Sequence, residues 1–156
     1  MINGNTEFLK GLCQETAQEI FALGTRLVLT SGAELFQMGA PADILYVVVR
    51  GRIKLTLPMP IRGLVQDIFV EERVAGQTVG WSALIPPYRF TLTASAPLES
   101  ELLALPREAL REYFAAHPAV GYAVSLNLAS VIGQRLELFQ AMWLREMERT
   151  VELRCA

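Results

Sequence analysis

Short runs of strand-forming residues, separated by turn signals, fill the chain between residues 25 and 105 and limit the folds open to it. Residues 52–57, for example, alternate polar and apolar side chains, as a strand with one buried face should. Gly32, Gly39 and Gly51 stand at three of the intervening turns. About eight such runs at intervals of roughly 8 to 12 residues are typical of a closed sandwich or jelly roll. The strands are expected at residues 26–30, 34–37, 44–49, 52–57, 65–74, 90–94 and 101–105, with a loop at 58–63.

Helical patterns flank this strand-rich segment on both sides. Before it, apolar residues recur at helical spacing between Thr6, a candidate N-cap, and Gly24. After it, Pro106 opens a short helix, and a longer helical pattern follows the break at His117–Pro118. We therefore predict one α+β, mainly β, domain over residues 1–156. Its parts are an N-terminal helix at 6–23, a β jelly roll at 25–105 and C-terminal helices at 106–150, the last of them covering residues 118–149.

The long C-terminal helix carries an apolar seam. From Ala129 onward, apolar residues follow at alternating steps of three and four residues, which is the pattern of a two-stranded coiled coil. The chain is 52% hydrophobic and only 19% charged, a balance that favours burial of apolar surface against a partner. The alternative is that the seam packs on the chain's own barrel. We predict a homodimer through Ile132, Leu136, Phe139 and Trp143.

Charge and residue usage argue against several other classes of protein. The net charge of −2 gives no basic bias for nucleic acid, and the residues after the long helix are too few for a recognition helix, so this chain alone is not expected to bind DNA. Cys13 and Cys155 lack metal-ligand spacing, and the single histidine, His117, has no catalytic partners, so neither a metal centre nor an enzyme is predicted. No secretory signal or membrane span is visible. We expect a cytoplasmic protein with free thiols and Cys13 buried in the first helix.

A glycine turn with a nearby arginine is the strongest candidate site. Gly80 precedes residues that predict one short helical turn, and Pro86–Pro87 ends it. Free N–H groups at the start of such a turn, together with Arg89, suit an oxyanion. Arg89 is the only charged residue between Arg73 and Glu99. Its guanidinium therefore reaches water, pairs with a distant carboxylate or binds an anionic ligand.

This segment resembles the phosphate-binding cassette of the cyclic-nucleotide-binding domain. The resemblance rests on Gly80, on residues 83–85 and on Arg89 followed by a threonine-rich strand, and it extends over roughly residues 8–145. That family includes the sensor domains of catabolite-activator-type regulators and of cyclic-AMP-dependent kinase subunits. The resemblance implies a jelly roll whose long C-terminal helix both dimerises and covers the ligand pocket.

In the family, backbone N–H groups of the short turn and the arginine hold the cyclic phosphate of cyclic AMP or cyclic GMP, and a glutamate after the glycine binds the ribose. Trp81 stands in place of that glutamate. Because an indole accepts no hydrogen bond, Trp81 would stack on the base or ribose instead. No further cofactor is implied. The implied ligand-binding residues are Gly80, Trp81, Ser82, Ala83, Leu84, Arg89, Phe90, Thr91 and, from the long helix near Ser130 and Arg135, Gln134.

Two functions remain open at this point. In the first, the chain is a regulatory sensor that binds a cyclic nucleotide or related oxyanion and signals through its dimer helix. In the second, it is a ligand-free dimeric interaction module whose vestigial pocket is filled by Trp81. Arg89 would then be stacked between Tyr88 and Phe90, which satisfies a guanidinium without phosphate.

Overall fold

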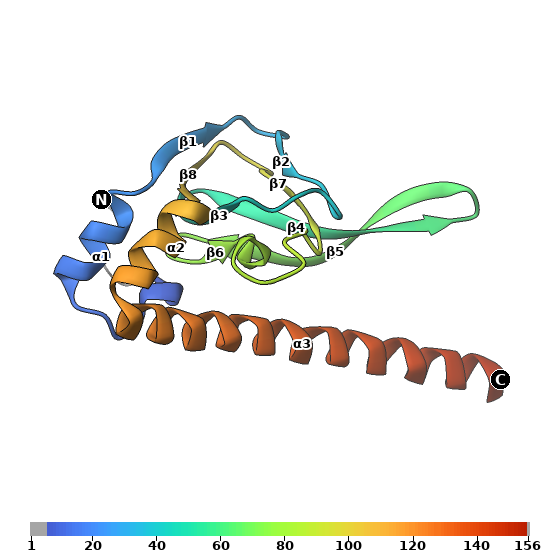
Figure 1. Cartoon of the computed structure of the whole chain (residues 1–156). Helices are drawn as coiled ribbons and strands as arrows, with labels where there is room; N and C mark the ends of the chain where they lie inside the picture. The colour runs from blue at the N-terminus through green and yellow to red at the C-terminus, as the bar shows by residue number, and fades with distance from the viewer. Residues whose placement is uncertain (1–5, 156) are drawn as a thin grey trace.

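Eight strands form two four-stranded antiparallel sheets, which confirms the predicted jelly roll (Figure 1). The computed structural model describes residues 6–155, so residues 1–5 and 156 of the predicted domain lie outside it. The first sheet has the order β1 (Thr25–Leu29), β8 (Ser100–Pro106), β3 (Ile44–Arg50) and β6 (Thr78–Val79). The second has the order β2 (Glu34–Phe36), β7 (Thr93–Ser95), β4 (Arg52–Ile61) and β5 (Leu64–Val74).

The hydrophobic core is centred on β3 and β8, which pair with each other in the first sheet. β8 is buried over nearly its whole length, including Leu102 and Leu105. Helix α2 (Arg107–Ala116) follows β8 directly and packs against it. Because β8 is covered on both of its faces, apolar side chains occur on both. Each fully buried leucine side chain stabilises the fold by about 1.5–3 kcal/mol.

The N-terminal helix is interrupted, in contrast to the single helix predicted for residues 6–23. It consists of a 3-10 turn, η1 (Glu7–Leu9), and helix α1 (Gln14–Phe21). Gly11 separates them with φ of 85°, a left-handed conformation that ends a helix. The prediction that Cys13 is buried was also wrong. Its thiol is exposed at the start of α1 and receives a hydrogen bond from, or donates one to, the Thr16 hydroxyl.

The predicted loop at residues 58–63 is instead the end of a long β-hairpin. β4 continues through Pro58 and Pro60, which face Asp67 and Val65 of β5. β7 pairs with β4 only as far as Thr56, so beyond this point β4 is an edge strand. An edge tolerates proline because the missing N–H group would point to solvent.

The strand predicted at residues 90–94 begins only at Thr93. Residue 90 bonds to a loop and not to the sheet, because the Phe90 N–H donates to the Ala40 carbonyl and the Phe90 carbonyl accepts from the Gly39 N–H. Arg89 forms an isolated bridge with Pro41 in the same loop. The short strand β6 was not predicted, since two residues carry no periodic signal.

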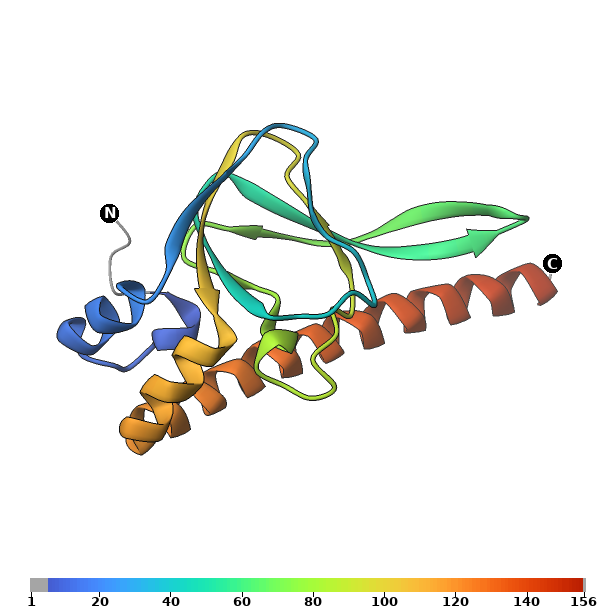
Figure 2. The ribbon, with the colours of Figure 1, turned by 45° about the horizontal axis from the view of Figure 1, so that its top comes forward.

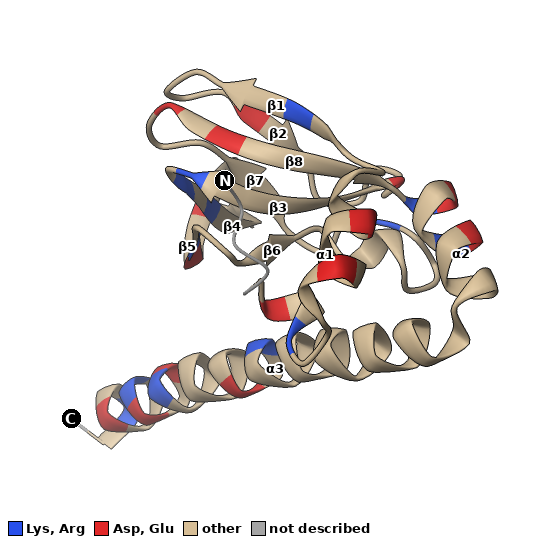
Figure 3. Ribbon diagram, turned by 90° about the vertical axis from the view of Figure 1, so that its left-hand side faces the viewer, with Lys and Arg blue, Asp and Glu red and all other residues tan. Residues whose placement is uncertain are grey.

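Helix α3 (Pro118–Cys155) runs under the barrel and continues beside the β4–β5 hairpin (Figures 1 and 2). The break between α2 and α3 falls at His117, as predicted, whereas α3 continues past the predicted end at residue 149. The Asn127 side chain donates to the carbonyls of Phe8 and Lys10 and so fixes α3 to the N-terminal segment. Residues 118–134 carry no charge, and charges of both signs follow from Arg135 on (Figure 3). Within residues 6–155, no helix combines the length and apolar character needed to span a membrane.

Candidate functional site

The cassette, residues 80–91, begins with a left-handed glycine. Gly80 has φ of 80° and ψ of 38°, and it caps the 3-10 turn η2 (Trp81–Ala83). A Cβ atom at this position would lie 3.0 Å from the Phe90 ring and 3.3 Å from the Ile44 carbonyl oxygen. Backbone conformation and crowding therefore both require glycine here. The tight turn and the short helical turn that the sequence predicts are present.

Two of the backbone donors expected to hold an oxyanion are already engaged inside this turn. The Ala83 N–H donates to the Gly80 carbonyl and the Leu84 N–H donates to the Trp81 carbonyl, each over 3.0 Å. Among the described residues, the N–H of buried Ser82 has no such backbone acceptor. The expectation that Ser82, Ala83 and Leu84 all offer free N–H groups was therefore wrong for the last two, because a 3-10 turn uses i to i+3 bonds.

Arg89 lies at the surface of the cassette. Its Nη1 donates to the Gly39 carbonyl over 2.8 Å, and none of the described carboxylates pairs with it. Of the three environments that the sequence left open, the exposed one is observed. Stacking of Arg89 between its aromatic neighbours is not observed, because Arg107 lies over the Tyr88 ring and the Phe90 ring is buried elsewhere.

The space inside the cassette is small and largely filled by aromatic side chains. Phe90 stacks on Phe36 with ring centroids 3.6 Å apart and planes inclined by 6°. A void of about 10 Å³ remains beside this pair. Its lining includes five of the predicted site residues, Gly80, Trp81, Ser82, Phe90 and Thr91, together with Arg135 of α3.

The α3 residue that lines the void beside the cassette is Arg135, whereas Gln134, the residue predicted from the sequence, does not line it. Gln134 is exposed, since successive residues of an α-helix point about 100° apart. The Arg135 side chain is only 10% exposed, and its Nη2 lies 2.5 Å from Glu71 Oε1. Its Nε is buried without a hydrogen-bond acceptor. Burial lowers the pKa of Arg135 below its usual value, although the Glu71 charge opposes this shift.

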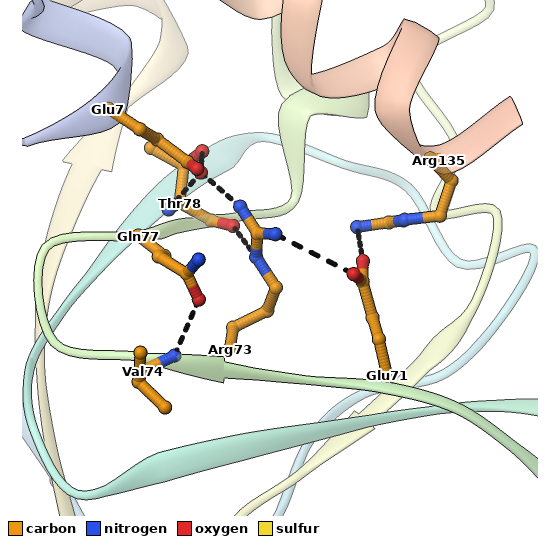
Figure 4. A network of polar contacts seen from close by, with 7 residues as sticks. All are labelled: Glu7, Glu71, Arg73, Val74, Gln77, Thr78 and Arg135. Carbon is orange, nitrogen blue, oxygen red and sulfur yellow. Dashed lines mark hydrogen bonds and ion pairs between the residues drawn. The ribbon is translucent and has the colours of Figure 1, made fainter. Parts of the chain in front are cut away.

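Glu71 and Arg135 belong to a buried ionic network that the sequence interpretation missed (Figure 4). Arg73 is 6% exposed, pairs with Glu7 of η1, and lies 3.6 Å from the Glu71 carboxylate. Arg73 Nε also donates to the Thr78 carbonyl, and Glu7 accepts from the Thr78 N–H over 2.6 Å. The network therefore connects η1, β5, β6 and α3 around one side of the pocket.

Of the three charged residues at positions 71–73, only Glu72 is exposed, and it pairs with exposed Arg52. No metal site is evident within residues 6–155, where no three His, Cys, Asp or Glu side chains group together. The candidate site thus consists of the cassette and the Glu71–Arg135 pair at the edge of its pocket.

Comparison with known proteins identifies the family. The cyclic nucleotide-binding domain family matches residues 26–117, so the chain belongs to this family. The N-terminal domain of a transcriptional regulator from Streptomyces coelicolor A3(2) has a similar structure, with a TM-score of 0.73 and 25% identity over 89% of this chain and 95% of that one. The catabolite activator protein of Thermus thermophilus shares the fold, with a TM-score of 0.72 and 24% identity, covering 95% of this chain and 62% of that one.

A curated relative shows that similar sequences also occur as part of a larger protein. The chain is 27% identical over 128 residues to Glutaminase 1 of Bradyrhizobium diazoefficiens. This match covers 82% of the present chain, which spans only 20% of that relative.

The family match and the similar fold of the Streptomyces domain identify the chain as a cyclic-nucleotide-binding-type sensor domain of the kind found in transcriptional regulators. This class of domain is typically non-catalytic.

Proposed function

We propose that the chain is a regulatory domain of the cytoplasm that binds a cyclic nucleotide or related oxyanion in the cassette pocket and signals through α3. The observation that carries this proposal is the meeting of the cassette and α3 at one void, where Trp81 and Ser82 lie beside the buried guanidinium of Arg135. Family membership supports the class of ligand. Arg89 would join the phosphate by leaving the Gly39 carbonyl, its single acceptor among the described residues.

Ligand entry requires a change in the pocket. A void of about 10 Å³ accommodates roughly one water molecule, so a nucleotide enters only if the lining side chains move. The Phe36–Phe90 pair and Arg135 are the groups in its way. Because Arg135 belongs to α3, binding would favour a different position of that helix.

The proposed output is a homodimer through the outward face of α3. Leu136 is 59% exposed and Trp143 is 63% exposed, while Ile132 is half-buried. Phe139 instead packs toward the chain's own core, so it is removed from the proposed interface. Further exposed apolar residues extend this face of the helix and are Tyr122, Leu126, Leu144, Met147 and Val151.

A ligand-free interaction module is the second candidate function. It is favoured by the near absence of free volume in the pocket and by the hydrogen bond that Arg89 already makes to Gly39. In this case Trp81 and the Phe36–Phe90 pair serve as core, and the exposed apolar face of α3 carries the function.

A thermal-shift titration with cyclic AMP, cyclic GMP and inorganic phosphate separates these two functions. A ligand at ~100 times its Kd stabilises the folded state by about 2.7 kcal/mol. For a chain of this length that is a rise in melting temperature of about 5 °C or more. We expect such a shift with a cyclic nucleotide, and its loss in Arg89→Ala.

Arg111→Ala is a suitable control, because this exposed arginine on α2 lies outside the pocket and pairs only weakly with Glu108. It should keep the shift of the parent protein. A shift preserved in Arg89→Ala would contradict the proposed role of this residue. No shift with any of the three compounds would favour the interaction module.

A further inference from the structure

The guanidinium of Arg135 is neutralised from within the protein before any ligand arrives. Its partner is Glu71 Oε1 at 2.5 Å, and the Glu71 side chain is 21% exposed. Arg135 also lines the void with Trp81 and Ser82. A ligand anion that reaches this void therefore meets a cation that a resident carboxylate already holds.

Both members of this pair have an alternative partner within reach. Arg135 Nε is a buried donor without an acceptor, and a guanidinium has five N–H groups, so an oxyanion in the void would satisfy an unpaired group. Glu71 would not be left alone, because its Oε2 is 3.6 Å from Arg73 Nη1. The carboxylate can therefore release Arg135 and keep a cation beside it.

A carboxylate and a ligand anion around one guanidinium repel each other in a poorly solvated site. We propose that Glu71 is a built-in competitor for Arg135. In the free protein its carboxylate holds α3 over the cassette pocket, and an anionic ligand binds by taking Arg135 from it. The competition between Glu71 and a ligand for Arg135 rests on the proposed function, whereas the contact by which Glu71 holds α3 does not.

Release of Arg135 by Glu71 would also affect the residues just before the cassette. Arg73, the second partner of Glu71, donates to the Thr78 carbonyl and pairs with Glu7. Thr78 stands two residues before Gly80. Movement of Glu71 toward Arg73 would therefore change the contacts of β6 and η1 as well as those of α3.

The competition is tested by fluorescence titration of the full chain carrying Trp143→Phe. The chain has two tryptophans, so this change leaves Trp81, which lines the void, as the only one. Cyclic AMP and inorganic phosphate are the probes. We expect Glu71→Gln to lower the apparent Kd by at least about tenfold, because the amide keeps an acceptor for Arg135 but removes the competing charge.

Two further variants serve as a control and as an alternative to Glu71→Gln. Glu72→Gln is the matched control, since Glu72 is the next residue on the strand and pairs outward with Arg52. It should leave the Kd unchanged. Glu71→Asp retains the charge on a shorter side chain and should give a Kd between those of the parent and Glu71→Gln, which covers the case that Glu71→Gln does not fold.

A double-mutant cycle in urea tests the holding contact without any ligand. Glu71→Ala, which unlike Glu71→Gln leaves no acceptor for Arg135, together with Arg135→Met and the double variant, should show a coupling of at least about fivefold in the unfolding equilibrium constant. Additive effects would overturn the holding role of Glu71.

The titration has outcomes that separate this inference from the proposed function. Binding that appears or tightens in Glu71→Gln supports both. A parent that binds while Glu71→Gln binds equally or more weakly overturns the competition and leaves the proposed function intact. If neither protein responds to either probe, the proposed function and the competition fail together, and the cycle alone decides the holding contact.

Discussion

Removal of the cation at the centre of the buried network should destabilise the protein strongly. The Arg73 side chain is 6% exposed and contacts both carboxylates, those of Glu7 and Glu71, as well as the Thr78 carbonyl. In Arg73→Met, Glu71 keeps Arg135 but Glu7 retains only its hydrogen bonds from Thr78. Breaking a buried ion pair from one side costs about 3–5 kcal/mol, because a charge is left without compensation. At ~2–4 °C per kcal/mol, the melting temperature falls by about 6–20 °C.

Urea unfolding followed by circular dichroism measures this loss as a change in midpoint at constant m value. Arg52→Met is the matched control on the neighbouring strand. Arg52 pairs with Glu72 over 3.3 Å, but its side chain is 56% exposed. An exposed pair contributes at most about 1 kcal/mol, so this variant should be close to the parent protein.

A compensating variant tests the physical cause. Glu7→Gln combined with Arg73→Met removes both charges, while the glutamine oxygen still accepts from the Thr78 N–H. Much of the lost stability should return, since no uncompensated carboxylate remains at residue 7. A loss in Arg73→Met of less than about 1 kcal/mol, or one equal to that of Arg52→Met, would refute the conclusion that the network is energetically buried.

Three other perturbations address separate parts of the molecule. Leu136→Glu together with Trp143→Glu should convert the proposed dimer to a monomer in sedimentation, and an unchanged dimer would exclude this face of α3. Gly80→Ala should lower the urea midpoint more than Gly32→Ala. Both glycines have φ near +80°, so both variants carry a backbone strain of about 1–2 kcal/mol, but only the Cβ atom at residue 80 would press against Phe90. Equal losses of stability would contradict the crowding at residue 80. The Tyr113 hydroxyl donates to Glu19 and this bond raises the pKa of Tyr113 to about 12. The contact should therefore stabilise the fold fully below the ordinary tyrosine pKa of about 10, and this stabilisation should be lost as pH rises through 12. An absorbance titration should show a late tyrosinate step that is missing in Tyr113→Phe.

The strands and turns that were predicted correctly depend on local signals. Gly32, Gly39 and Gly51 have φ between 83° and 86°, a left-handed conformation that glycine adopts readily and that the residue type therefore predicts. The extent of β4 was missed because it depends on a neighbour. Pro58 and Pro60 are tolerated only where β7 no longer pairs with β4, and no local pattern says where that is.

The candidate site shows the same division between local and distant causes. The left-handed turn at Gly80 follows from its own sequence. The acceptor of Arg89 is the carbonyl of Gly39, 50 residues earlier in the chain, which local reasoning does not identify. Arg135, and not its neighbour Gln134, lines the void, because the rotation of α3 depends on how its buried residues Leu128 and Val131 pack.

A single bulge in β5 explains why the buried network escaped prediction. Phe69 faces Thr56 and Glu71 faces Leu55, so Val70 between them has no partner on β4. Because side chains alternate along a strand, one extra residue reverses the faces of everything that follows. Without the bulge, Glu71 would point to solvent, as its charge suggests.

With the bulge, Glu71 and Arg73 both turn toward the barrel, where α3 supplies Arg135 and η1 supplies Glu7. Four charged groups in so little solvent are compatible with a stable fold only if each lies beside a group of opposite charge. Their pairing therefore constrains where α3 and η1 lie against the sheet. Under the proposed function, the affinity of the pocket for an anion would depend on how strongly the ligand and Glu71 each bind Arg135. A ligand that displaced Glu71 from Arg135 would change the contacts that position α3, so in this proposal ligand binding and the position of α3 are coupled through the Arg135 guanidinium.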